Sequence, residues 1–124
     1  MARLREMHRS GVRMLAGTDV GALLMLPGYG LHDELAMLVE AVGTTPMEAL
    51  QAATRNPAEY FGVQDSLGTV EPGRAADLVL LDADPLEDVR NTRAVRAVVA
   101  NGVLLDRAAL DRLAPVQGAP ALRR

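Results

Sequence analysis

Residues 12–19 read VRMLAGTD, and the expected architecture follows from this segment. Its apolar first half is short and is typical of a strand that is buried on both faces. A helical pattern precedes it, with Leu4 and Met7 on one face and Gly11 as the expected end of the helix. Helix, glycine and strand in this order are the step that α/β proteins repeat. We therefore predict an α/β fold, in which Asp19 stands at the end of the strand.

Two helices are predicted after a long loop at residues 17–30, and loops of this length often carry function. Residues 31–42 have apolar side chains at helical spacing and end at a glycine. Thr44 or Thr45 then caps a second helix, since a proline and a glutamate follow at the expected positions. We expect Asn56-Pro57 to end this helix, before a short helical turn at 58–61.

The second half of the chain has the pattern of an antiparallel β domain. Short apolar runs bounded by turn residues predict four strands, at residues 67–70, 78–81, 95–100 and 103–105. Asn101-Gly102, between the last two, is a strong hairpin signal. The change near Gly62 predicts three units, at residues 1–62, 63–107 and 108–124. The last unit comprises a short helix at 108–113 and a tail at 115–124.

Composition excludes several classes of function. The 124 residues are 49% hydrophobic, contain no cysteine and carry a net charge of −3. This charge argues against a nucleic-acid partner, which would need a basic face. The absence of cysteine excludes disulfides and cysteine-based zinc sites, and it is compatible with the cytoplasm, where we expect the protein. No apolar stretch is long enough to cross a membrane, and residues 1–10 do not have the pattern of a signal peptide.

A series of short motifs runs through residues 5–105. In order, the blocks are AGTD (16–19), HDEL (32–35), TPMEAL (45–50), ATRNPA (53–58), GV (62–63), Gly68, PGRAADLVLLD (72–82), DPL (84–86) and VVANG (98–102). The series resembles the C-terminal portion of metal-dependent amidohydrolases, notably the imidazolonepropionase-like and prolidase-like branch. Gly-Thr-Asp alone is a weak signal, whereas the whole series in this order is specific.

The resemblance implies a (β/α)₈ TIM barrel together with a small β-sandwich built from both chain ends. Residues 12–19 would be the eighth barrel strand, 31–55 the helices that follow it and 66–105 the C-terminal share of the sandwich. Asp19 would be the strand-eight aspartate, which in this family contacts the metal and works as the general base. The implied reaction is hydrolysis of carbon–nitrogen bonds, including peptide bonds to proline, in a small-molecule amide or peptide-like substrate, by metal-activated water.

Much of the family's site lies outside this sequence. The His-x-His of the first strand, the bridging lysine or glutamate and the later ligand histidines are absent, and His8 and His32 stand at no ligand position. A catalytic metal typically needs about three protein ligands. We therefore expect this chain to be a fragment that is inactive alone. We expect the full-length enzyme to hold a divalent metal, most simply zinc. The fragment's partner would be the missing N-terminal part of the barrel. Whether the protein also forms a homo-oligomer is left open by the sequence.

Each candidate residue also has a purely structural interpretation. Without the resemblance, Asp19 would be a cap or turn residue after a strand. His32 either lines the mouth of the active site as a substrate-binding residue or bonds to the loop before its helix. Two further functions stay open: a non-enzymatic α+β module for binding or oligomerisation, and one chain of a split enzyme. Exposed strand edges argue against the module, because they promote self-association.

Overall fold

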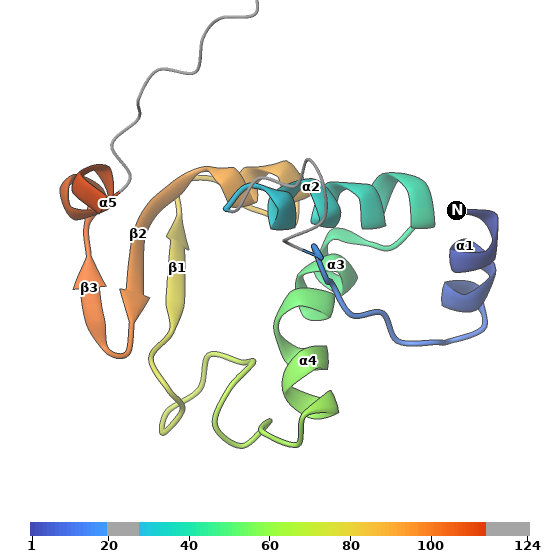
Figure 1. The fold of residues 1–124 in the computed structure, drawn as a ribbon, viewed down its shortest axis with the longest axis horizontal. Coiled ribbons are helices and arrows are strands. Elements are labelled where there is room, and N and C mark those ends of the chain that lie inside the picture. Colours follow the sequence, from blue (N-terminus) through green and yellow to red (C-terminus); the bar gives the residue numbers. More distant parts are fainter. Residues whose placement is uncertain (20–27, 114–124) are drawn as a thin grey trace, which may run out of the picture.

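The computed structural model describes residues 1–19 and 28–113, which form a helical part and a three-stranded sheet (Figure 1). The helical part comprises α1 (Ala2–Arg9), α2 (Gly30–Met37), its π-helical extension η1 (Leu38–Val42), α3 (Pro46–Ala53) and α4 (Arg55–Tyr60). The second part comprises β1 (Leu78–Leu81), the 3₁₀ helix η2 (Val89–Arg93), β2 (Val95–Ala100), β3 (Val103–Leu105) and α5 (Arg107–Leu113). The fold is α/β as predicted, and the described residues form one open sheet and no closed barrel.

Local signals decide where the helices begin and end. Gly11 (φ 82°) follows α1, and Gly43 (φ 91°) ends η1 in the left-handed conformation that favours glycine. Thr45 begins α3 with a capping box. Its hydroxyl accepts a hydrogen bond from the Glu48 N–H, and the Glu48 carboxylate accepts one from the Thr45 N–H. The predicted helices are confirmed here, with Thr45 as the cap.

The break between α3 and α4 lies earlier than predicted. Thr54 (φ −129°, ψ −79°) separates the two helices, and Asn56 and Pro57 lie in the first turn of α4. Proline is tolerated there because the N–H groups of a first helical turn have no partner within the helix. The prediction that Asn56-Pro57 ends the helix was therefore wrong, and the expected short turn at 58–61 belongs to α4.

The sheet is antiparallel, with the strand order β1-β2-β3. Leu78 lies opposite Val99 in the first pair, and Val98 lies opposite Leu105 in the second. β2 and β3 are joined by Asn101 (φ 49°) and Gly102, which have the positive φ angles that a tight two-residue hairpin turn requires. Three of the four strands predicted in the second half of the chain, and the hairpin, are confirmed.

The fourth predicted strand, residues 67–70, does not form. The segment bends against α4 instead, with Gly68 (φ 94°) close to Thr54 and Ala58. A strand exists only through pairing, and no strand among the described residues lies beside this segment. Only the Gly68 backbone approaches the helix closely, since Leu67 and Val70 leave 40% and 82% of their surface exposed.

Residues 12–16 form no paired strand in the part of the chain that the structure describes, so this prediction is wrong for the chain by itself. The sheet offers them no partner, because its three strands pair only with one another. Parallel strands need neighbours that are distant in the sequence. Most of the predicted functional loop (20–27) and the predicted tail (115–124) lie outside the described residues.

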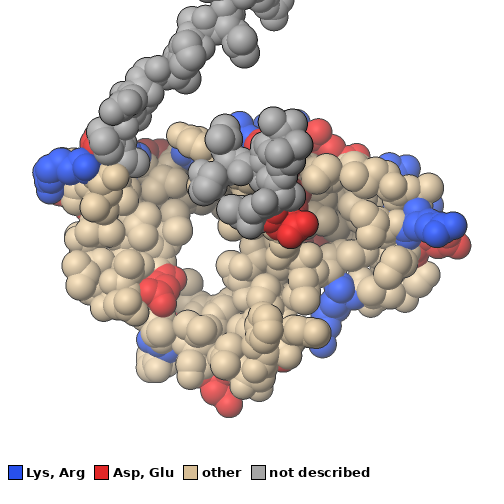
Figure 2. Space-filling view, viewed as in Figure 1, with Lys and Arg blue, Asp and Glu red and all other residues tan. Residues whose placement is uncertain are grey.

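The two parts of the molecule meet through η2. Leu35 of α2, Ala49 of α3 and Val89 of η2 form the buried apolar cluster. Figure 2 shows an open gap between the sheet and the helices α3 and α4, so the two parts are not packed along their full length. The sequence does not predict η2, because a short 3₁₀ helix has no recognisable periodicity.

No helix in residues 1–19 and 28–113 has the length and apolar character needed to span a bilayer.

Candidate functional site

Three hydrogen bonds to α2, α3 and α4 hold the backbone at Met14, Ala16 and Gly17, in the segment that leads to Asp19. The Asn56 side-chain Nδ2 donates to the Met14 carbonyl oxygen at 2.9 Å, and the Ala16 N–H donates to the Ala52 carbonyl oxygen at 2.8 Å. Farther along, the Gly17 N–H donates to Oε1 of Glu34 at 2.7 Å. Side-chain and helix-end groups therefore bind this backbone in the place of strand neighbours.

Asp19 is exposed and follows the last of these three contacts by two residues. Its φ of 49° lies in the left-handed region, which aspartate tolerates better than most residues with a side chain. The residues that immediately follow it lie outside the described part of the chain. Asp19 thus follows a held segment that is not a strand, and its side chain is exposed to solvent, while its catalytic role stays a prediction.

His32 lies in the first turn of α2 and contacts η2. Its Nδ1 is 3.0 Å from Oγ1 of Thr92, and that hydroxyl donates to the carbonyl oxygen of Val89 at 2.8 Å. Because the hydroxyl proton is directed to Val89, Thr92 accepts from Nδ1–H of the ring, and the neutral imidazole then has a bare Nε2. Burial, and after it the charge of Arg93, lowers the pKa of His32.

The N-terminal half of α2 is bonded on two sides. On one side, Asp33 forms an ion pair with Arg93, next to the His32–Thr92 contact. On the other side, Glu34 binds the Gly17 backbone. His32 is therefore directed to η2 and not, by any hydrogen bond of the described residues, to Asp19. Its proposed substrate contact stays a prediction.

Two residues of this arrangement, Glu34 and Thr92, were not predicted from the sequence. The motif block at 32–35 includes Glu34, but helical periodicity identifies it only as a polar position on α2. Thr92 lies in η2, which has no sequence signal. A contact across 60 residues, such as that from His32 to Thr92, becomes visible only when both segments are packed.

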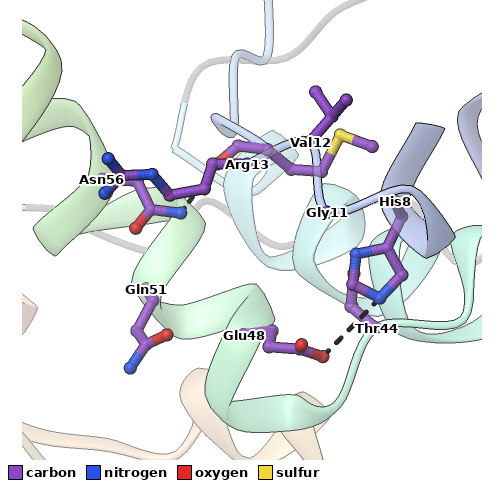
Figure 3. Close-up of a pocket in the computed structure, with 9 residues that line it drawn as sticks. His8, Gly11, Val12, Arg13, Thr44, Glu48, Gln51 and Asn56 are labelled. Carbon is purple, nitrogen blue, oxygen red and sulfur yellow. Dashed lines mark hydrogen bonds and ion pairs between the residues drawn. The ribbon is translucent and has the colours of Figure 1, made fainter.

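A separate groove of about 190 Å³ lies between α1, the start of the 12–19 segment and α3 (Figure 3). Across it, Nε2 of His8 is 3.8 Å from Oε2 of Glu48. The Thr45 N–H and hydroxyl, with a smaller contribution from His8, hold the pKa of Glu48 below its usual range. Glu48 is already occupied by the capping box, so these contacts hold α1 against α3 and indicate no catalytic role.

The described residues do not make up a metal centre. Within residues 1–19 and 28–113, no three side chains of His, Asp or Glu gather closely enough to hold a metal ion. Asp19 can supply one carboxylate, whereas a catalytic site typically has about three protein ligands. The donor set of these residues is therefore incomplete for the expected divalent metal.

The sequence pattern named "Amidohydrolase family" matches residues 1–105. This chain belongs to the amidohydrolase family. The match includes every residue of the 12–19 segment and the three helices α2, α3 and α4 that bind it, so the resemblance seen in the motif series is confirmed. The family is generally metal-dependent.

Individual amidohydrolases are similar over most of this chain. The adenine deaminase of Rubrobacter xylanophilus is 42% identical over 92 residues, which are 73% of this chain and 15% of the relative. The N-acetylgalactosamine-6-phosphate deacetylase of Escherichia coli O157:H7 is 35% identical over 63% of this chain and 19% of its own length. The crystal structure of a Xaa-Pro dipeptidase superposes with a TM-score of 0.76 at 31% identity, over 85% of this chain and 25% of that one.

These relatives have two features in common. Their names describe removal of ammonia, an acetyl group or an amino acid, and each of these reactions breaks a carbon–nitrogen bond by hydrolysis. The chain also spans only 15% to 25% of the length of each of the three.

Proposed function

We propose that this chain supplies the aspartate end of the active site of a hydrolase that cleaves carbon–nitrogen bonds in small amide or peptide-like substrates. The observation that carries the proposal is the family match, which includes Asp19 and the helices that hold its segment. The reactions named for the three relatives support the bond type. They differ too much to favour one substrate within that class.

Asp19 is the general base in this proposal. Its ionised carboxylate takes a proton from water as the water oxygen bonds to the electrophilic carbon of the substrate. The carboxyl group then returns that proton to the leaving nitrogen as the carbon–nitrogen bond breaks. A short, acceptor-only side chain on a firmly held backbone suits both steps, and the exposure of Asp19 gives water access to it.

The proposal assigns a divalent cation, zinc by preference, to the complete enzyme. Asp19 would be one ligand, and the remaining ligands would come from parts of the enzyme outside these 124 residues. Because a single carboxylate is a weak site, we expect the isolated chain neither to retain the cation nor to hydrolyse substrate.

The partner that we propose is the preceding part of the barrel, on the same polypeptide or on a second one. Val12 and Leu15 each leave 43% of their surface exposed on a segment without strand neighbours among the described residues. The two outer strands of the sheet also carry exposed apolar side chains, Val79 on β1 and Leu104 on β3. Packing against further strands would bury these side chains and pair the free backbone groups.

The test begins with the DNA upstream of the Met1 codon, where we expect an open frame that encodes His-x-His and further strand-end histidines. The longer protein should release amine or ammonia from a panel of Xaa-Pro dipeptides, N-acetyl amides and adenine. Asp19→Asn should lower its kcat by about 10²–10⁴-fold, the usual contribution of a general base. Asp65→Asn, at an exposed turn, is the matched control and should retain activity.

Two results would contradict the proposal: an upstream region without such histidines, or full activity in Asp19→Asn. Cooperative unfolding of the 124-residue chain as a soluble monomer, together with no hydrolysis by the longer protein, would favour the non-enzymatic module instead.

A further inference from the structure

We propose that Glu34 is a positioning residue that holds Asp19 in place through the backbone of Gly17. The inference rests on the proposed function for its catalytic consequence, whereas the anchoring itself rests only on geometry. Oε1 of Glu34 accepts a hydrogen bond from the Gly17 N–H at 2.7 Å. A bond to a charged acceptor at this distance is stronger than one between neutral groups.

The Glu34–Gly17 hydrogen bond can position Asp19 because of where it lies along the segment. The contacts from Asn56 and Ala52 fix the backbone at Met14 and Ala16, which leaves the last residues of the segment to be held separately. Among the described contacts, the Glu34 bond is the one nearest to Asp19. Without it, the backbone between Ala16 and Asp19 could rotate, and the carboxylate would move with it.

The conformation of Asp19 makes an anchor necessary. A residue with a side chain at a φ of 49° is less stable than in the ordinary regions, and it persists when the surrounding structure holds the chain in place. Gly17 is two residues away, so fixing its N–H limits the backbone arrangements that are open to Asp19. The expected effect of Glu34 is therefore on the placement of the carboxylate.

Glu34 is itself held by its helix. The two residues that precede it contact η2, His32 through Thr92 and Asp33 through Arg93. The N-terminal half of α2 thus lies between the sheet part and the Asp19 segment, with Glu34 bonded to that segment. Because α2 is fixed at its first turn, the Glu34 carboxylate presents a rigid acceptor to Gly17.

Hydrogen exchange of the Gly17 amide in the 124-residue chain tests the anchoring directly. In the unmodified chain this amide should be protected, and Glu34→Ala should speed its exchange by about tenfold, the value of one hydrogen bond to a charged group. Glu34→Gln, which retains an acceptor oxygen, should restore most of the protection. Glu40→Ala is the matched control, since it removes an exposed pair with Arg90 and leaves Gly17 untouched.

An unprotected Gly17 amide in the unmodified chain would overturn the inference. Equal exchange rates in the unmodified chain and Glu34→Ala would do the same. The Ala49 amide, in the buried face of α3, shows whether a variant has lost the fold, since its exchange should stay unchanged in all three variants.

Kinetics of the longer protein tests the catalytic consequence. Glu34→Ala should lower kcat by about 10²-fold with little change in KM, as expected when a catalytic group is misplaced by about 1 Å, and Glu34→Gln should recover most of the rate. Loss of activity in Asp19→Asn with full activity in Glu34→Ala would refute the positioning role alone. Full activity in Asp19→Asn would refute the proposed function, while the exchange result would still decide the anchoring.

Discussion

The hydroxyl of Thr92 stands between the His32 ring and the backbone of η2. It lies 3.0 Å from Nδ1 of His32 and donates to the carbonyl oxygen of Val89 at 2.8 Å. Since Val89 also belongs to the buried cluster with Leu35 and Ala49, the polar contact and the apolar contact fix η2 on α2 together. This is the junction through which the helical part meets the sheet part.

Removing the Thr92 hydroxyl should weaken this junction. Thr92→Val leaves the Nδ1–H of His32 without its acceptor in a half-buried place, and we expect the free energy of unfolding to fall by about 1–3 kcal/mol. Urea unfolding followed by far-UV circular dichroism measures it. Thr69→Val, which removes a hydroxyl bonded to the exposed Glu71, should change stability by no more than about 0.5 kcal/mol. Equal losses in the two variants would contradict this account.

Acid should destabilise the fold through His32. Burial and Arg93 place its folded pKa below the ordinary value of 6.5, so the unfolded chain binds more protons as the pH falls. The contribution of neutral His32 to the free energy of unfolding is complete above pH 6.5. It is lost as the pH falls from 6.5 through the pKa of His32 in the folded chain. The measurement is the free energy of unfolding at pH 7.5 and at pH 5.5. His32→Gln should remove this part of the pH dependence, and His8→Gln should leave it in place.

The capping box of α3 gives a third prediction. Thr45→Ala removes the side-chain oxygen that accepts from the Glu48 N–H, and the free energy of unfolding should fall by about 0.5–2 kcal/mol. Thr45→Ser keeps that oxygen and should lie within a few tenths of a kcal/mol of the unmodified chain. If serine destabilised as much as alanine, the methyl group and not the cap would be responsible.

Substitutions at Gly68 and Gly73 distinguish the cost of an unfavourable backbone conformation from the cost of a steric clash. Both have a positive φ, 94° and 88°, but a Cβ on Gly68 would lie 2.7 Å from the Cβ of Ala58, whereas Gly73 has open space around it. Gly73→Ala should cost about 1–2 kcal/mol from backbone conformation alone. Gly68→Ala should cost about 1–3 kcal/mol more, because the segment must move away from α4. The losses of stability are measured by urea unfolding. Equal losses in the two variants would show that the segment around Gly68 moves away from α4 at no cost.

The predictions that succeeded depend on signals within a few residues. Thr45, Pro46 and Glu48 specify a helix start, and Asn101-Gly102 specifies a hairpin, because each acts on its own backbone. The predictions that failed concern segments whose structure depends on neighbours, such as the strand at 12–16 and the strand at 67–70. Apolar runs of this kind indicate that a segment tends to be buried, but they do not identify the element against which it packs.

The candidate site divides in the same way. Asp19 is a candidate from the sequence alone, because its place at the end of the 12–19 segment and its motif series can be seen along the chain. Glu34 and Thr92 were not found, since each acts through one hydrogen bond to a residue well separated along the chain. Single contacts of this kind leave no periodic trace in a sequence.

The family, most of the helices, the three strands of the sheet and the position of Asp19 along the chain follow from the amino-acid sequence. How η2 joins the two parts, and which groups hold the backbone before Asp19, became visible only in the folded chain. The physical reason is the range of the interactions. Caps, turns and helix periodicity arise within one or two turns of chain, whereas contacts across 17, 42 or 60 residues depend on how all the elements pack.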